Sequence, residues 1–194
     1  MTAWIAFVEG SIDATVTRRV FDTVGLPLSS VTPCGGTPGL EARMPNLAAA
    51  ARFQRVFVLR DLDRLDCVPT LLRSMQPNAP SGLVIRVAVR QVEAWLLADR
   101  DACARWIGVA AKDIARDVES LADAKDHLVS LAAKSKHRGF KNGFVPQASA
   151  ASARVGPRYT AEVERFVRTR WDPERAARHS ESLSRALRAL RSAT

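Results

Sequence analysis

The chain has 194 residues, of which 47% are hydrophobic and 25% are charged. This composition is ordinary for a globular protein, and the length suits one domain with an appendage or two small domains. No stretch reaches the ~18 apolar residues of a membrane span, and the start has no basic segment, so we expect no membrane span and no signal peptide. Three cysteines far apart in the sequence give no zinc spacing or disulfide framework, which predicts a cytoplasmic protein.

The net charge of +9 is unevenly distributed. Residues 1–100 carry +2 and residues 101–194 carry +7, and six basic side chains but no acid lie between Lys134 and Arg158. This asymmetry indicates a polyanionic partner, most simply nucleic acid. Solubility, or a genome rich in G and C, would also explain it. The candidate nucleic-acid contacts are Arg64, Arg90, Lys134, Lys136, Arg138 and Lys141.

Short apolar runs alternate with helical patterns over the first hundred residues. Four runs have the length and composition of buried strands: residues 4–8, 28–34, 56–59 and 83–89. Helices are expected at 11–24, with Ser11 as the cap, at 40–53, where Pro45 delays or kinks the helix, at 68–75 and at 90–99. The pattern predicts an α/β fold: a compact Rossmann-like domain over 1–100 with a central, mostly parallel four-stranded sheet.

The second half reads as a helical extension covering residues 101–194. The expected helices are 102–107, 113–121, 123–134, 159–171 and 173–190. Between them, the glycines, prolines and small residues of 135–157 predict a long loop, so that 134–158 forms a basic loop.

Two carboxylates follow the third predicted strand. In an extended segment Asp61 and Asp63 point to the same side, and two carboxylates at one spot repel unless a proton or cation lies between them. Hard oxygen ligands suit Mg²⁺ or Mn²⁺. The plainer interpretation is a turn or a helix cap. A calcium loop is disfavoured, because Asp66 and Leu72 occupy its glycine and glutamate positions.

Polar residues also follow the first and fourth predicted strands. Glu9 lies where the first strand meets a helix, and Asp13 lies in that helix's first turn. Arg90 and Glu93 follow the last strand, and their alternative role is a salt bridge on the helix surface. Because the carboxyl ends of parallel strands share one edge, where α/β sheets bind ligands, we expect these side chains to converge.

In this order, the motifs resemble the TOPRIM fold of topoisomerases, bacterial primases, a ribosomal-RNA maturase and the OLD-type nucleases. The matches are Phe7-Val8-Glu9-Gly10 and Leu59-Arg60-Asp61-Leu62-Asp63, and the resemblance covers about residues 3–100. The nuclease branch's Glu-Gly-x-x-acid form is matched by Glu9 to Asp13, with Asp in place of the usual Glu. The segment Glu93 to Asp99 is similar to small uncharacterised TOPRIM-like proteins, many encoded beside ATPases and suspected of a role in phage defence.

The resemblance implies a role for each matched residue. Glu9 would be the catalytic acid/base or a metal ligand, Asp61 and Asp63 would bind Mg²⁺ or Mn²⁺, and Asp13 would be the additional nuclease ligand. Glu93 completes the candidate catalytic set. OLD-type nucleases also use a lysine, for which Lys134, Lys136 and Lys141 are candidates. A topoisomerase would need a nucleophilic tyrosine, and the sole Tyr159 lies in the helical half.

Three functions are consistent with these residues. The first is a metal-dependent endonuclease acting on DNA or RNA, with ATP control supplied by a separate ATPase chain since the sequence has no Walker A motif, and with assembly into a homo-oligomer as a further expectation. The second is a TOPRIM-fold module that binds nucleic acid or a partner without catalysis. The third is a phosphatase or sugar-nucleotide transferase, although such phosphatases usually carry Asp-x-Asp on their first strand.

Overall fold

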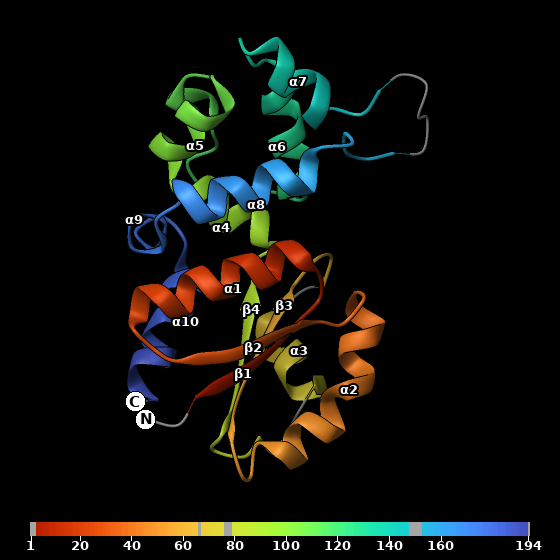
Figure 1. Cartoon of the computed structure of the whole chain (residues 1–194), viewed down its shortest axis with the longest axis vertical. Helices are drawn as coiled ribbons and strands as arrows, with labels where there is room; N and C mark the ends of the chain where they lie inside the picture. Colours follow the sequence, from red (N-terminus) through yellow and green to blue (C-terminus); the bar gives the residue numbers. More distant parts are fainter. Residues whose placement is uncertain (1–2, 66, 76–78, 148–152, 194) are drawn as a thin grey trace.

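The computed structural model describes residues 3–65, 67–75, 79–147 and 153–193 (Figure 1). Its four strands form one parallel sheet in the order β2-β1-β3-β4. They are β1 (Trp4–Val8), β2 (Leu28–Pro33), β3 (Arg55–Asp61) and β4 (Leu83–Ala88). The predicted α/β fold class with a parallel sheet is confirmed. Asp66, which disfavoured a calcium loop, lies outside the described residues.

Helices cover both faces of the sheet because successive strand residues point to opposite sides. The α2 (Thr37–Ala50) and α3 (Val68–Met75) helices bury Leu40 and Leu71 against Val56, Ile85 and their neighbours. On the opposite face lie α1 (Ser11–Val24) and α10 (Glu181–Ser192), which share a core with Phe57 and Leu59 (Figure 1). This two-sided burial explains why β3 is a nearly continuous apolar run.

The remaining helices lie beyond the carboxyl ends of the strands (Figure 1). They are α4 (Val92–Ala98), α5 (Arg100–Ile107), the 3₁₀ turn η1 (Ala111–Asp113), α6 (Ala124–Ala133), α7 (Arg138–Phe144), α8 (Tyr159–Thr169) and α9 (Pro173–Ala177). The α8 helix packs along α1, and α6 and α9 pack on α4. Residues 101–194 thus contribute to the same core as one face of the sheet. None of the helices described is both long and apolar enough to span a bilayer.

Several predicted elements differ from the structure. The expected helix at 113–121 is replaced by η1 and turns. Asp117 accepts hydrogen bonds from the backbone N–H and the hydroxyl of Ser120, which closes a turn instead of continuing a helix. The expected helix at 173–190 is two helices, since Ser180 caps α10 by accepting the Leu183 N–H.

The loop predicted for 135–157 contains the α7 helix. Aromatic packing explains it, because Phe140 and Phe144 both contact the Trp106 ring edge-on. Residues 148–152 of the predicted loop lie outside the described residues. Two smaller corrections concern helix starts: Gly10, not Ser11, is the N-cap of α1, and α2 runs through Pro45 instead of starting after it.

Candidate active site at the carboxyl edge of the sheet

Three carboxylates and one lysine line a cavity of about 140 Å³ at the carboxyl edge of the sheet. Asp61 is the last residue of β3, and Asp13 lies in the first turn of α1. Glu93 lies in the first turn of α4, and Lys125 lies in the first turn of α6. Four elements that are distant in sequence therefore bring their polar side chains to one place.

Glu9 joins this site from the end of β1. Its Oε1 accepts the backbone N–H of Asp61 at 3.1 Å, and its Oε2 accepts the Thr37 hydroxyl at 2.7 Å. The Arg60 Nε lies 4.0 Å from Glu9 Oε1. The predicted convergence of the β1 and β3 ends is therefore present. Through these two hydrogen bonds, Glu9 links the end of β1 to the end of β3 and to the start of α2.

Backbone hydrogen bonds orient two of the acids. Asp13 Oδ2 accepts the Gly10 N–H at 2.9 Å, and Asp61 Oδ1 accepts the Val92 N–H at 2.9 Å. Within the described structure, the buried Asp13 Oδ1 and Glu93 Oε2 have no hydrogen-bond partner. A buried carboxylate oxygen without a donor is costly, so these two atoms are suited to receive an additional ligand.

Burial and the proximity of other acids raise the pKa values of two of these carboxyl groups. Burial, followed by the nearby charges of Glu93 and Glu9, raises the pKa of Asp13 to about 7. Burial and then the charges of Asp13, Glu93, Glu9 and Asp63 raise the pKa of Asp61 well above its ordinary value. Such shifts arise where carboxylates share a site with too few cations.

Glu93 is held inside the protein rather than on a helix surface. It is 1% exposed, its Oε1 accepts the Tyr159 hydroxyl at 2.8 Å, and Lys125 Nζ lies 3.4 Å from the same oxygen. Although burial alone would lower the pKa of Lys125, Glu93 and the other acids raise it overall, so Lys125 is a cation. The alternative of a surface salt bridge to Arg90 is wrong, because Arg90 donates instead to the Asp63 and Leu65 carbonyls.

Asp63 occupies a different position from Asp61. The extended strand ends at Asp61, Leu62 is buried, and Asp63 has a left-handed φ of 51°. The alternation on which the same-side prediction rested therefore ends before Asp63. Asp63 lines a second cavity of about 480 Å³, whose other charged residues are Arg60, Arg64, Asp123 and Arg154. Its role as a metal ligand stays a prediction.

The predicted basic residues do not gather around the carboxylates. Lys134 follows the carboxyl end of the ten-residue α6, roughly 14 Å along the helix axis from Lys125. Lys136 follows Lys134, and Arg138 and Lys141 belong to α7. Arg64 alone among the predicted nucleic-acid contacts lines the second cavity. Arg90 supports the loop after β3 through its two backbone acceptors.

Lys125 is the site residue that the sequence did not reveal. It lies two residues after Asp123, the N-cap of α6, and nothing in its local pattern distinguishes it from a surface lysine. Its backbone N–H donates to Gln91 Oε1 at 3.0 Å, which ties the start of α6 to the start of α4. This contact and the packing of α6 on α4 bring its ammonium group to Glu93.

Mg²⁺ and Mn²⁺ are bound in proteins by hard oxygen ligands such as carboxylates. In the part of the chain that is described, no three His, Cys, Asp or Glu side chains are arranged to hold one ion together. Mg²⁺, however, keeps several of its waters and is commonly held through one or two carboxylates. The unpaired oxygens of Asp13 and Glu93, with Asp61 beside them, supply that type of donor. The residues therefore fit a hydrated divalent cation.

The chain is similar to solved structures of the C-terminal regions of OLD proteins. The chain is similar to that of Burkholderia pseudomallei, with 17% identity and a TM-score of 0.44 over 87% of this chain and 98% of the other. It is also similar to that of Xanthomonas campestris pv. campestris, with 16% identity and a TM-score of 0.41 over 87% and 95%. No protein-family model and no curated protein sequence matches the chain.

Proposed function

We propose that this protein is a metal-dependent phosphodiesterase that cuts nucleic acid. The observation that carries the proposal is the convergence of Asp13, Asp61 and Glu93 with Lys125 around one small cavity at the carboxyl edge of the sheet. The buried carboxylate oxygens without hydrogen-bond donors and the raised pKa values of Asp13 and Asp61 support the proposal of a cation-binding site. A bound Mg²⁺ or Mn²⁺ would polarise a phosphate oxygen and lower the pKa of a water molecule.

The protein's own residues would position and balance this site. Tyr159 and Lys125 hold the Glu93 carboxylate, while Glu9 fixes the ends of β1 and β3 relative to each other. Lys125 is the cation available to stabilise charge that develops on a phosphate group. We assign it the role for which the sequence offered Lys134, Lys136 and Lys141, because it alone of these is in contact with a site carboxylate.

We propose that the nucleic-acid backbone lies along the second cavity, the one that Asp63 lines. Gln91 lines it, and the same Gln91 side chain accepts the Lys125 N–H, so the two cavities are neighbours. Two arginines line this cavity, but Arg60 is buried and pairs with Glu41 at 2.6 Å, whereas Arg64 is exposed. Guanidinium groups bind phosphate with paired donors, so we propose that a phosphate flanking the cut site lies against Arg64.

The decisive experiment is a cleavage assay with supercoiled plasmid DNA and labelled single-stranded RNA in Mg²⁺, Mn²⁺ or EDTA. We expect cleavage that requires the metal and falls at least about 100-fold in Asp61→Asn and Glu93→Gln, since each removes a charge from the centre. Asp22→Asn, at the exposed end of the same α1 helix, is the matched control and should cut normally. Equal cutting by all variants would rule the proposal out.

A second pair of variants identifies the lysine. Lys125→Met should reduce cleavage by tenfold or more, because Glu93 loses its cationic neighbour. Lys134→Met should leave cleavage unchanged, since Lys134 lies at the opposite end of α6. The reverse result would assign the role to the residue indicated by sequence order and would refute the role of Lys125.

Two observations favour a second candidate function, a nucleic-acid-binding or interaction module without catalysis. Both oxygens of Glu9 already accept hydrogen bonds, and no ready three-ligand metal group exists among the described residues. This function predicts salt-sensitive nucleic-acid binding through exposed Arg64 and the basic residues of α7, with no metal-dependent cleavage.

The resemblance of the sequence to small TOPRIM-like proteins encoded beside ATPases supports a wider proposal. We infer that the nuclease works with an ATPase chain, as the effector of a system that acts against phage. Co-purification of the two chains, together with ATP-dependent stimulation or restraint of cleavage, would test this association.

A further inference from the structure

The β4 strand forms an edge of the sheet. Among the strands described, it pairs only with β3. The hydrogen bonds at its two ends fix which backbone groups point outward: Val56 N–H donates to the Gly82 carbonyl, and Leu62 N–H donates to the Ala88 carbonyl. The backbone hydrogen-bonding groups of the even-numbered residues from 82 to 88 therefore point to β3. The N–H and C=O groups of Ile85 and Val87 point the other way, to the open edge.

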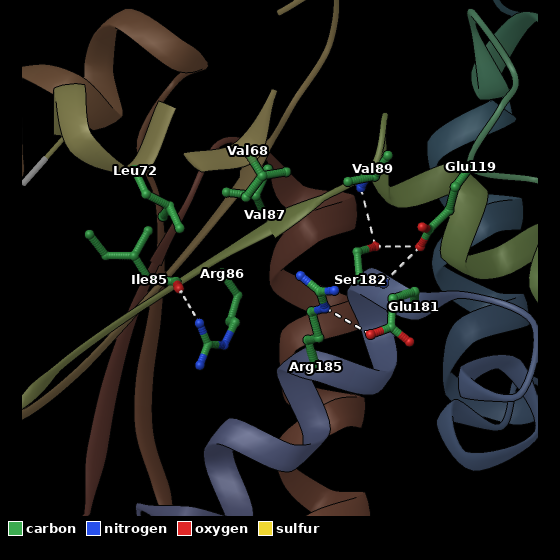
Figure 2. A pocket seen from close by; sticks show the side chains of 10 residues that line it. All are labelled: Val68, Leu72, Ile85, Arg86, Val87, Val89, Glu119, Glu181, Ser182 and Arg185. Carbon is green, nitrogen blue, oxygen red and sulfur yellow. Dashed lines mark hydrogen bonds and ion pairs between the residues drawn. The ribbon is translucent and has the colours of Figure 1, made fainter. Parts of the chain in front are cut away.

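A cavity of about 310 Å³ lies against this edge. It is lined in succession by Ile85, Arg86 and Val87, whose side chains alternate between the two faces of the sheet. A cavity that touches both faces of one strand must lie along the strand's edge. Figure 2 shows its two sides, with Val68 and Leu72 of α3 on one side of β4 and the polar residues of α10 on the other.

Arg86 has no carboxylate partner in the described structure. Its Nε is buried without a hydrogen bond, and its Nη1 donates to the adjacent Ile85 carbonyl at 3.0 Å (Figure 2). Burial lowers the pKa of this guanidinium group. A half-buried cation whose one hydrogen bond in the described structure goes to its neighbour's outward carbonyl would be stabilised by an incoming carboxylate.

The acids of the groove are already engaged. Glu181 accepts from Arg185 Nε at 2.8 Å and pairs with Arg188 at 3.2 Å. Glu119 Oε1 accepts from both the N–H and the hydroxyl of Ser182. The lining as a whole is balanced, with Arg86 and Arg185 against Glu119 and Glu181. Neither acid forms an ion pair with Arg86 in the described structure, so Arg86 is the cation of the groove that lacks a carboxylate partner beside an apolar wall.

We propose that this edge groove binds an extended segment of a partner protein, which adds to the sheet next to β4 and places a carboxylate side chain against Arg86. Side chains of an added strand alternate in step with those of β4. The segment should therefore read apolar–acidic–apolar, with its apolar residues toward Val68 and Leu72 of α3. Strands that lack the acid are disfavoured, because they would bury Arg86 unpaired.

A second copy of this chain is a poorer occupant. Pairing two β4 edges would bring two Arg86 side chains into one groove, and the sequence of β4, Leu83–Ala88, contains no acid to oppose them. Charge complementarity thus selects a different chain with an acidic strand.

The test uses an array of fluorescein-labelled seven-residue peptides whose centres read apolar–Glu–apolar, each paired with its Gln counterpart. We expect members of the Glu set to bind the full chain, as measured by fluorescence anisotropy, and their Gln counterparts to bind at least about tenfold more weakly. Arg86→Gln should abolish this preference, whereas Arg168→Gln, on the exposed face of α8, should preserve it. Bound peptide should also slow hydrogen exchange at the Ile85 and Val87 amides.

A backbone variant tests the strand addition itself. Val87→Pro removes an N–H that points away from β3, and edge strands tolerate proline, so the sheet should remain folded by circular dichroism while peptide binding is lost. Equal binding of Glu and Gln peptides, unchanged binding by Arg86→Gln, or slowed exchange only outside β4 would overturn the proposal. A dimer of the chain, detected by sedimentation and dissociated by Val87→Pro, would also overturn the proposal, because the occupant of the edge would then be a second copy. Asp61→Asn should bind peptide normally, which separates this site from the nuclease centre.

Discussion

At the scale of single residues, the candidate site is defined by acids that outnumber their cations. Asp13, Asp61 and Glu93 share one cavity with Lys125, and Glu9 lies beside them. The arrangement is unfavourable at neutral pH, because like charges in a buried place repel. The divalent cation that we propose for this site would relieve the repulsion.

The first prediction concerns the pH dependence of stability in EDTA. The pKa of Asp13 rises from 3.8 to about 7 on folding, so its stabilising contribution is complete below about pH 4 and is lost as the pH rises through 7. Stability should therefore fall by up to roughly 1.4 kcal/mol per pH unit across this interval. Asp13→Asn should flatten the slope in urea titrations at pH 4 to 8, and Asp22→Asn should not. An unchanged slope in Asp13→Asn would contradict the assignment.

The second prediction concerns the Tyr159 hydroxyl, which donates to Glu93 Oε1 inside the protein. Tyr159→Phe should lower the free energy of unfolding by about 1–3 kcal/mol, because a buried carboxylate loses a donor. Urea denaturation at pH 7 measures the change. Thr169→Ala, which removes an exposed hydroxyl, is the comparison and should change stability by much less. Equal effects would mean that Tyr159 contributes only its ring.

At the scale of elements, the helices beyond the strand ends complete the site. The α4 helix brings Glu93 directly after β4, and the start of α6 brings Lys125 through the Gln91 side chain. The opposite end of α6 leads to the basic residues of α7. One helix therefore separates the site carboxylates from the basic residues of α7, and a nucleic acid that touched both would extend along α6.

The third prediction tests the break between α9 and α10. Ser180 accepts the Leu183 N–H and donates to Glu119 Oε1, so Ser180→Ala should lower the free energy of unfolding by about 1–2 kcal/mol. Thermal unfolding, with Ser184→Ala within α10 as the control, measures this. If the two variants were equally stable, the cap would not hold the start of α10.

At the scale of the whole molecule, the sheet and the helical region share one core, so binding at the site should stabilise the entire fold. The fourth prediction is that Mg²⁺ or Mn²⁺ at about 100 times its Kd adds roughly 2.7 kcal/mol, which raises the Tm by roughly 5–10 °C for a chain of this size. Differential scanning fluorimetry with and without EDTA measures the shift. Asp61→Asn should abolish it, and a shift that survives this change would place the metal elsewhere.

The sequence alone determined the elements of the sheet and two of its polar ends. The apolar runs around Ala6 and Val58 identified buried parallel strands, and the residues that follow them, Glu9 and Asp61, do meet. This was predictable because strand periodicity is local, and because parallel strands always bring their carboxyl ends to one edge.

Tertiary structure alone decided the remaining composition of the site. Asp63 does not point to the same side as Asp61, because the chain turns after the strand. Glu93 is buried because Tyr159 and Lys125 pack over it. Lys125, and not Lys134, contacts Glu93 because of the way α6 docks on α4, which depends on contacts between residues far apart in the chain. Local patterns specify which face of a helix is buried, but the partner of that face is set only when the whole core assembles.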